Sequence, residues 1–285
     1  MKMKKLNIGL YGFGVVGQGL YAVLEKSKTV EASLAAICVK HENKKRDFDS
    51  PLLTFDREKI LNDPEVNVVV EVIDDAAEAY RLVKEALKKG KSVVSGNKKM
   101  LAAHLEEMIG LQKKYGASLL YDASACGSIP IIRNLEEYYD NDLLKSITGI
   151  LNGSSNYILT QIFRENKSYA TALQEAQELG FAESNPDADV QGHDALYKLV
   201  IITAHAFGIV VSPDEVFRFG INRISDFDVQ FAKEKGWKIK LVARVVKTDK
   251  EKVAAWVAPQ FVAGESYIYN VEDEYNGVVI EGEFY

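Results

Sequence analysis

The chain reads Leu6-Asn7-Ile8-Gly9-Leu10-Tyr11-Gly12-Phe13-Gly14-Val15-Val16-Gly17 at residues 6–17, an apolar strand that runs directly into spaced glycines. In such a motif the first glycine permits a tight turn, the second lets the backbone approach a pyrophosphate, and the third allows close packing. The following helix start adds N–H groups and a positive dipole. Strand and helix supply the context that the motif requires, so a merely structural turn is the weaker interpretation. We therefore expect a dinucleotide to contact Gly12, Phe13, Gly14, Val15, Val16 and Gly17.

The residues that follow the second predicted strand, 33–39, bear on the choice of coenzyme. An acidic residue at this point commonly binds the ribose 2'-hydroxyl of NAD. This chain has Lys40 there instead, and three more cations follow it at Lys44, Lys45 and Arg46. Because cations suit a 2'-phosphate, NADP is the favoured coenzyme. Glu42 leaves NAD possible, and a solvated charged loop without a ligand is the plain alternative.

Strands and helices continue to alternate through the first half of the chain. Apolar runs of the parallel-sheet type predict strands at residues 66–72 and 92–95, with a helix at 76–89 between them. Asn97 and Lys98 follow the second of these strands, so we expect them at the carboxyl edge of the sheet, where open α/β folds bind ligands. For Lys98, an ordinary surface lysine is an equally reasonable interpretation. This α/β rhythm predicts a Rossmann-type nucleotide-binding domain at residues 1–132.

The remaining residues, 133–285, are expected to form a second, α+β domain that binds substrate. The turn Asn152-Gly153-Ser154 joins a predicted strand to a helix, and its backbone N–H groups suit a carboxylate or simply cap the helix. Two further strands are predicted at residues 237–246 and 253–261, on either side of a charged turn.

A polar loop leads into a helix at residues 194–207 that is apolar nearly all round from Leu199 onward, as in helices buried on every face. Its first turn carries Asp194 and Lys198, and the loop brings Glu183 and Asp189 to the same end. On an exposed helix an acid–base pair four residues apart adds only about 0.2–0.5 kcal/mol. Charges moved out of water cost several kcal/mol unless they are compensated, so four of them indicate a site. A lysine among carboxylates is a candidate general acid or base.

Composition and charge narrow the classes of protein and partner. The 285 residues are 47% hydrophobic and 27% charged, enough for one large or two ordinary globular domains. The net charge of −6 gives no electrostatic reason to expect nucleic acid or an anionic membrane as a partner. No apolar run approaches the ~18 residues of a membrane span, and the lysine-rich start is unlike a signal peptide. With reduced thiols expected at Cys38 and Cys126, the cytoplasm is the expected compartment.

Together these motifs resemble the homoserine dehydrogenase family along essentially the whole chain. The matching segments are residues 12–17, 97–98, 127–132, 149–157 and 183–198, the last being the most specific. The resemblance implies NAD(P)-dependent interconversion of L-aspartate 4-semialdehyde and L-homoserine, in threonine, methionine and isoleucine biosynthesis, by a homodimer. The alternatives are another two-domain NAD(P)-dependent dehydrogenase of a small amino-acid substrate, and a catalytically inactive nucleotide-binding paralogue.

The resemblance also implies roles by position. Lys198 and Lys98 would be the proton-transferring and polarising lysines, and Asn97 would contact the coenzyme. Five residues would bind the substrate: Glu183 and Asp194 at its amino and hydroxyl ends, Asp189 in support, and Gly153 and Ser154 on its carboxylate side.

Three features depart from the family pattern. Family members often hold a sodium ion through backbone carbonyls of the loop at residues 122–127, in which Asp122 and Ala125 replace the typical residues. Phe181 stands where a tyrosine is common. Family members also continue beyond the strand that ends near residue 285, so we expect this chain to be part of a longer protein.

Overall fold

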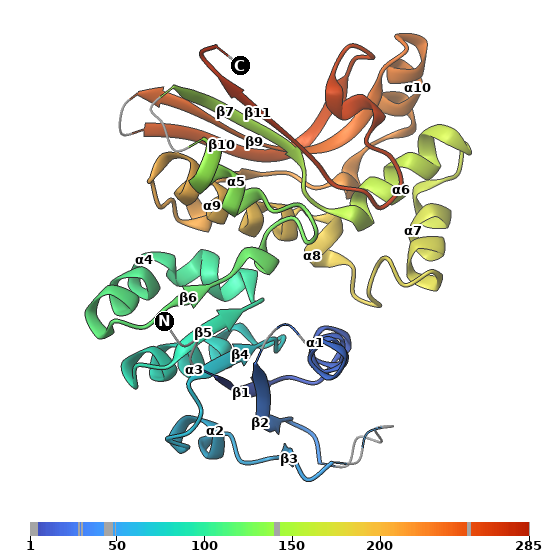
Figure 1. The fold of residues 1–285 in the computed structure, drawn as a ribbon. Helices are drawn as coiled ribbons and strands as arrows, with labels where there is room; N and C mark the ends of the chain where they lie inside the picture. The colour runs from blue at the N-terminus through green and yellow to red at the C-terminus, as the bar shows by residue number, and fades with distance from the viewer. Residues whose placement is uncertain are drawn as a thin grey trace. The chain divides into compact units, whose positions relative to one another are not determined.

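The computed structural model describes residues 5–27, 29, 31–42, 48, 50–139, 143–249 and 252–284 (Figure 1). Backbone contacts divide the chain into two compact units, Met1–Ser124 and Ala125–Tyr285. This division comes earlier than the domain boundary predicted after residue 132. The reason is helix α5 (Ile131–Tyr138), which buries Ile131, Ile132 and Leu135 and packs against helix α9 (His193–Phe207) of the second unit.

The first unit is built on a six-stranded sheet in the order β3-β2-β1-β4-β5-β6, in which the paired strands are parallel. Its strands are β1 (Leu6–Tyr11), β2 (Ala32–Cys38), β3 (Leu53–Thr54), β4 (Val68–Glu71), β5 (Ser92–Ser95) and β6 (Leu119–Leu120). Its helices are α1 (Val15–Lys26), α2 (Glu58–Asn62), α3 (Ala76–Lys88), α4 (Lys98–Tyr115) and the short 3₁₀ turn η1 (Asp122–Ser124). The strand order reverses between β1 and β4, which creates the switch point where such sheets bind ligands.

The sequence of the central strands explains their position in this sheet. Leu10, Ile37, Val69 and Val93 are fully buried, because helices cover parallel sheets on both faces and leave no polar side. The predicted Rossmann-type α/β domain is therefore confirmed. At the edge of this sheet β6 is short, since only Leu119–Leu120 pairs with β5.

The second unit contains a five-stranded sheet in the order β11-β7-β9-β10-β8. Its strands are β7 (Leu144–Ile150), β8 (Phe217–Arg218), β9 (Lys238–Asp249), β10 (Lys252–Val262) and β11 (Gly277–Gly282). The pairs β7–β9, β7–β11 and β9–β10 are antiparallel, and β8 joins β10 in parallel. This sheet confirms the predicted second, α+β domain, with the two strands expected around the charged turn as its long hairpin.

Helices pack on this sheet through its middle strand. Besides α5 and α9 they are α6 (Gly153–Arg164), α7 (Tyr169–Glu178), α8 (Asp187–Val190) and α10 (Asp226–Glu234), with 3₁₀ turns η2 (Pro213–Glu215), η3 (Ile221–Arg223) and η4 (Tyr267–Asn270). Both α6 and α9 contact β9 (Figure 1). The interior of α9 is buried from Leu199 to Thr203, as its apolar sequence predicts. Across the described ranges, no helix combines the length and apolar content needed to cross a membrane.

Candidate active site

Asn152 joins the start of helix α6 to two carboxylates. It follows β7 and caps α6, where its Oδ1 accepts the Ser155 N–H at 2.8 Å. Its Nδ2 donates to Asp189 Oδ1 at 2.6 Å and to Asp194 Oδ2 at 3.0 Å. One buried amide thus fixes the helix end and both acidic side chains at once. Asn152 was not among the site residues expected from the sequence, although its position as a helix cap in the Asn152-Gly153-Ser154 turn was a usable signal.

Lys198 completes this cluster from helix α9. Its Nζ lies 2.8 Å from Asp194 Oδ2, one helical turn earlier, and donates to the Leu151 carbonyl at 2.7 Å. The side chains of Lys198 and Asp194 are only 14% and 8% exposed, so their attraction is weakly screened. An ammonium has three N–H donors, and the described residues accept two of them. The third is available for a substrate oxygen.

Asp189 lies half-buried on α8 at the edge of the same cluster. Burial is the main cause that raises the pKa of its carboxyl, and the nearby charge of Asp194 adds to the effect. The hydrogen bond from Asn152 and the charge of Lys198 act in the opposite direction. Asp189 therefore ionises less readily than a solvated aspartate, and the charge of Asp194 is the one that Lys198 balances most directly.

The first turn of α6 offers backbone N–H groups beside this cluster. The N–H groups of Gly153 and Ser154 belong to the set that a helix does not use internally, which suits a carboxylate. Ser154 Oγ donates to the Phe181 carbonyl at 2.5 Å, and the Phe181 ring lies 4.8 Å from that of Tyr157. These contacts tie the start of α6 to the loop that precedes α8.

Glu183 lies on that loop and is exposed. Its backbone carbonyl accepts a hydrogen bond from Gln177 Nε2 at 3.0 Å. Among the described residues, its carboxylate makes no ion pair with Lys198. The structure thus brings together three of the four ionisable groups singled out in the sequence, Asp189, Asp194 and Lys198, and leaves the fourth at the surface.

The other lysine of interest, Lys98, is positioned by the first unit. It is the first residue of α4, which Asn97 caps by accepting the Met100 N–H at 3.0 Å. Asn97 Nδ2 also donates to the Ile73 carbonyl at 3.0 Å, so this side chain connects the chain ends that follow β4 and β5. Each of the two predicted catalytic lysines is therefore held by its own unit.

A buried acid, Glu71, underlies this edge of the first unit and was not identified from the sequence. Its Oε2 accepts the Ser95 hydroxyl at 2.6 Å and its Oε1 accepts the Ile73 N–H at 2.8 Å. Burial raises the pKa of the Glu71 carboxyl, while the two hydrogen bonds act against that rise. The sequence signal that could have identified Glu71 is its position as an acidic residue at the end of an otherwise apolar strand. The two hydrogen bonds of Glu71 fix the segments that follow β4 and β5, and these segments hold Asn97.

The glycine turn after β1 fits a pyrophosphate group. Gly12 has φ +97°, and a Cβ there would lie 2.6 Å from the Val72 carbonyl oxygen. A Cβ on Gly17 would overlap the Gly12 carbonyl oxygen, whereas a Cβ on Gly14 would meet nothing within 4 Å. The first turn of α1 has no acidic residue, and its cap makes no side-chain hydrogen bond. Gly12 and Gly17 thus shape the turn, and Gly14 keeps open the space that a phosphate needs, beside Phe13, Val15 and Val16.

Lys40 is exposed just beyond β2, at the carboxyl edge of the same sheet. The pKa of the Asp75 carboxyl is lowered, first by the Glu78 N–H that it accepts as helix cap and more weakly by the charges of Lys40 and Lys99. Lys40 therefore contributes positive potential near the start of α3. Its sequence neighbours Lys44, Lys45 and Arg46 lie outside the described residues.

In the loop that includes Asp122 and Ala125, backbone carbonyls accept hydrogen bonds from within the loop. The Tyr121 carbonyl accepts hydrogen bonds from both the N–H and the Oγ of Ser124, at 2.9 and 2.5 Å. The Ala125 carbonyl accepts the Gly127 N–H, and the Cys126 carbonyl accepts the Ile129 N–H. Within the described ranges, no three His, Cys, Asp or Glu side chains form a metal-binding group.

The two units together define a class of protein. A doubly wound sheet with an open glycine turn, in one chain with an α+β unit that gathers a lysine and two carboxylates, is the architecture of a nicotinamide-dependent oxidoreductase.

Comparisons with known proteins identify the family. A family model described as the NAD-binding domain of homoserine dehydrogenase matches residues 12–122, and one described as homoserine dehydrogenase matches residues 130–285. The chain belongs to the homoserine dehydrogenase family. Homoserine dehydrogenase of Bacillus subtilis is 34% identical over 99% of this chain and 67% of its own length. The corresponding protein of Helicobacter pylori is 35% identical over 98% of this chain and 67% of its own.

Solved structures agree with these relatives. A homoserine dehydrogenase from Thiobacillus denitrificans superposes with a TM-score of 0.93 at 31% identity, over 99% of this chain and 67% of that one. A hyperthermophilic archaeal homoserine dehydrogenase in complex with NADPH gives a TM-score of 0.80 at 28% identity, over 97% of this chain and 88% of that one. The chain thus spans about two thirds of the length of its bacterial relatives and nearly nine tenths of that archaeal one.

Proposed function

We propose that the protein interconverts L-aspartate 4-semialdehyde and L-homoserine with NADP as coenzyme, a step that serves threonine and methionine synthesis. The observation that carries this proposal is the Lys198–Asp194 pair, held by Asn152 beside the open first turn of α6. That arrangement combines a proton donor with a binding place for an amino-acid carboxylate. Family membership supports the assignment of the substrate.

Lys198 is the group that we assign to proton transfer. The nicotinamide, when bound, supplies or accepts the hydride. With two N–H groups fixed by Asp194 and the Leu151 carbonyl, Lys198 directs its third toward the substrate oxygen. It stabilises the negative charge where that charge develops and then delivers the proton, and in the reverse direction it takes the proton from the homoserine hydroxyl.

The remaining residues bind and orient the substrate. Gly153 and Ser154 donate N–H groups to the substrate carboxylate, Asp194 holds its hydroxyl end together with Lys198, and Asp189 supports Asp194 through Asn152. We assign Glu183, on its exposed loop, to the substrate ammonium group, and Lys98 to polarisation of the reacting carbonyl.

The choice of coenzyme rests on the first unit. The turn at residues 12–17 would hold the pyrophosphate, Asn97 would lie near the nicotinamide end, and Lys40 would meet the 2'-phosphate of NADP. The positive potential at Lys40 and the absence of an acid in its place support NADP over NAD. The comparison of kcat/KM for the two coenzymes tests this preference, and a strong NAD preference contradicts it.

We also propose that the protein acts in the cytoplasm as a homodimer assembled through its second unit. Exposed aromatic side chains at Phe217, Phe227 and Tyr267, which are 63%, 76% and 85% exposed, are apolar surface that a second copy would cover. Light scattering measures the mass in solution, and a monomer at micromolar concentration contradicts the dimer.

The central test of the proposed function is NADPH oxidation with aspartate semialdehyde, followed by absorbance. Turnover that is lost in Lys198→Met supports the assignment. Turnover with a different small amino-acid aldehyde or alcohol, and none with this pair, would identify another dehydrogenase. NADPH binding without turnover of any of these substrates would identify an inactive nucleotide-binding paralogue.

A further inference from the structure

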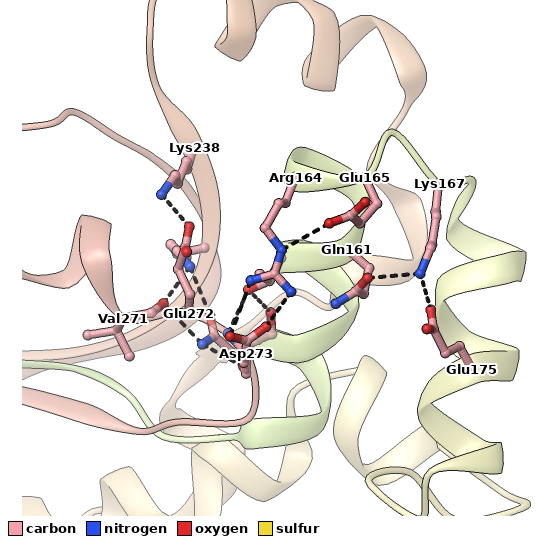
Figure 2. A network of polar contacts seen from close by, with 12 residues as sticks. Gln161, Arg164, Glu165, Lys167, Glu175, Lys238, Val271, Glu272 and Asp273 are labelled. Carbon is pink, nitrogen blue, oxygen red and sulfur yellow. Dashed lines mark hydrogen bonds and ion pairs between the residues drawn. The ribbon is translucent and has the colours of Figure 1, made fainter.

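Helix α6 carries a second set of contacts on a different side from the Lys198 cluster. Gly153, Asn156, Thr160 and Arg164 are spaced three, four and four residues apart, so they form one stripe along the helix. All four contact residues 271–275, the segment that connects η4 to β11. Figure 2 shows part of this network, with Arg164 and Asp273 facing one another. The segment is thus attached along the length of the helix whose first turn we assign to the substrate.

Asn156 is the centre of these contacts. It is 1% exposed, and its Nδ2 lies 3.1, 2.9 and 3.2 Å from the carbonyl oxygens of Val271, Asp273 and Tyr275, which share its two N–H donors. One amide reaches alternate carbonyls because the segment curls at Asp273, whose φ of +52° is rare for a residue other than glycine. Thr160 Oγ1 accepts the Asp273 N–H at 3.0 Å. Surrounding contacts of this kind are what maintain an unfavourable backbone conformation.

Lys240 on β9 holds Asn156 in this orientation. Its Nζ donates to Asn156 Oδ1 at 3.1 Å and to the Val271 carbonyl at 2.5 Å. Lys240 is 1% exposed, and within the described ranges no carboxylate lies at ion-pair distance from its ammonium group. Burial lowers the pKa of Lys240 to about 8, the charge of Lys238 adds to this, and Glu272 and Asp273 oppose it. An apolar side chain of similar length would cost less to bury, so packing alone does not account for a lysine here.

The segment continues directly to the proposed substrate-binding turn. A Cβ on Gly153 would lie 2.5 Å from the Glu274 carbonyl oxygen, so the backbone at residue 274 rests against the first residue of α6. On the other side of the same turn, Asn152 bonds to Asp189 and Asp194. The first turn of α6 therefore lies between the segment and the acidic cluster. A shift of the segment would move the N–H groups of Gly153 and Ser154 relative to Lys198.

We propose that Lys240 and Asn156 are positioning residues for the substrate carboxylate: they fix residues 271–275, and through the Glu274 backbone they set the place of the first turn of α6. This inference rests on the proposed function, because it assigns the carboxylate of the amino-acid substrate to that turn. Neither residue touches the reacting atoms, and neither belongs to the coenzyme-binding unit.

The substitution Lys240→Met tests the proposal, because it removes the ammonium group and keeps an unbranched apolar stem. We expect the KM for L-homoserine to rise about tenfold, with kcat and the KM for NADP within about twofold. The matched control is Lys167→Met. Lys167 also contacts α6, through Gln161 Oε1 at 2.9 Å, but it connects that helix to Glu175 of α7 instead of the 271–275 segment (Figure 2). Its KM for L-homoserine should stay within about twofold of the unsubstituted protein.

A substrate analogue makes the test specific for the carboxylate. 3-Aminopropan-1-ol has the amino and hydroxyl groups of homoserine but no carboxylate, so the Lys240→Met substitution should leave its kcat/KM unchanged. A loss of equal size for homoserine and for the analogue would show general disruption and overturn the proposal. An unchanged KM for homoserine in a folded Lys240→Met protein would overturn it as well.

A milder variant covers the case in which Lys240→Met does not fold. Thr160→Val removes the acceptor of the Asp273 N–H in a side chain of the same shape, and we expect it to raise the KM for homoserine about threefold with kcat retained. If Thr160→Val leaves that KM unchanged, the segment does not position the turn. Failure of the proposed function would look different, because the unsubstituted protein would then show no turnover of homoserine at all.

Discussion

Replacement of Lys198 by methionine should cripple turnover and leave coenzyme binding nearly intact. The substitution removes the proposed proton donor and leaves the Asp194 carboxylate, 8% exposed, without the ammonium group that balances its charge. Proton transfer by a positioned side chain contributes about 10²- to 10⁴-fold, so we expect kcat to fall by about 10³, or roughly 4 kcal/mol of barrier. Among the described residues, Lys198 contacts Asp194 and the Leu151 carbonyl, both in the second unit, so the Kd for NADPH should change less than about threefold. Stopped-assay turnover and NADPH fluorescence titration measure the two quantities.

The same substitution also has a cost in stability, which must be separated from the loss of catalysis. Removing one partner of a buried ion pair typically destabilises by about 3–5 kcal/mol, because the other charge stays buried. The double variant Lys198→Met/Asp194→Asn removes that charge, so it should recover most of the lost Tm without recovering activity. A fall in kcat of less than about tenfold, about 1.4 kcal/mol, would refute the role of Lys198. Recovery of activity together with Tm would refute it too, since the defect would then be one of folding.

Three further predictions concern other parts of the molecule. Lys40→Asp should shift the ratio of kcat/KM for NADP over NAD toward NAD by about tenfold or more, and an unchanged ratio would mean that Lys40 does not meet the 2'-phosphate. Gly14→Ala should fold normally, because its Cβ meets nothing within 4 Å, but should weaken NADPH binding at least tenfold, whereas Gly17→Ala should lower Tm because its Cβ overlaps a backbone oxygen. Burial lowers the pKa of Lys240 from 10.5 to about 8, so the folded state binds this proton less tightly than the unfolded state. The free energy of unfolding therefore has its full value above pH 10.5, where Lys240 is neutral in both states. It decreases as the pH falls from 10.5 toward 8. Urea denaturation between those pH values should show the loss, by a few kcal/mol, in the unsubstituted protein and not in Lys240→Met.

Features that depend on local sequence could be predicted. The glycine turn predicted the doubly wound sheet because a tight turn, a helix start and close packing are all set within a dozen residues. The continuous apolar run from Leu199 predicted a buried helix for the same reason, and the spacing of Asp194 and Lys198 placed both on one side of its first turn. The structure agrees on each of these points.

Features that depend on distant residues could not be predicted. Asn152 meets Asp189 and Asp194 across 37 and 42 residues, and Lys240 meets Asn156 across 84. No periodicity in the sequence records such pairs, because they exist only once the strands and helices are packed. Glu183 shows that proximity in the sequence is not sufficient either. It lies only a few residues before Asp189, but its carboxylate is exposed and lies outside the cluster. The place of α5 in the second unit could not be predicted for a similar reason, because its partner α9 lies more than fifty residues further along the chain.

The double use of the Asn152 side chain makes the site observable without substrate. The oxygen of its amide holds the Ser155 N–H, and the nitrogen of the same amide holds Asp189 and Asp194. Since the planar amide cannot turn without breaking both sets of bonds, exchange of the Ser155 backbone proton for deuterium reports whether the carboxylates are in place. Exchange of this one amide proton should be slow while the cluster is assembled and fast when the Asn152 hydrogen bonds are broken. Its rate would therefore report, in the protein without substrate, how often the active site is assembled.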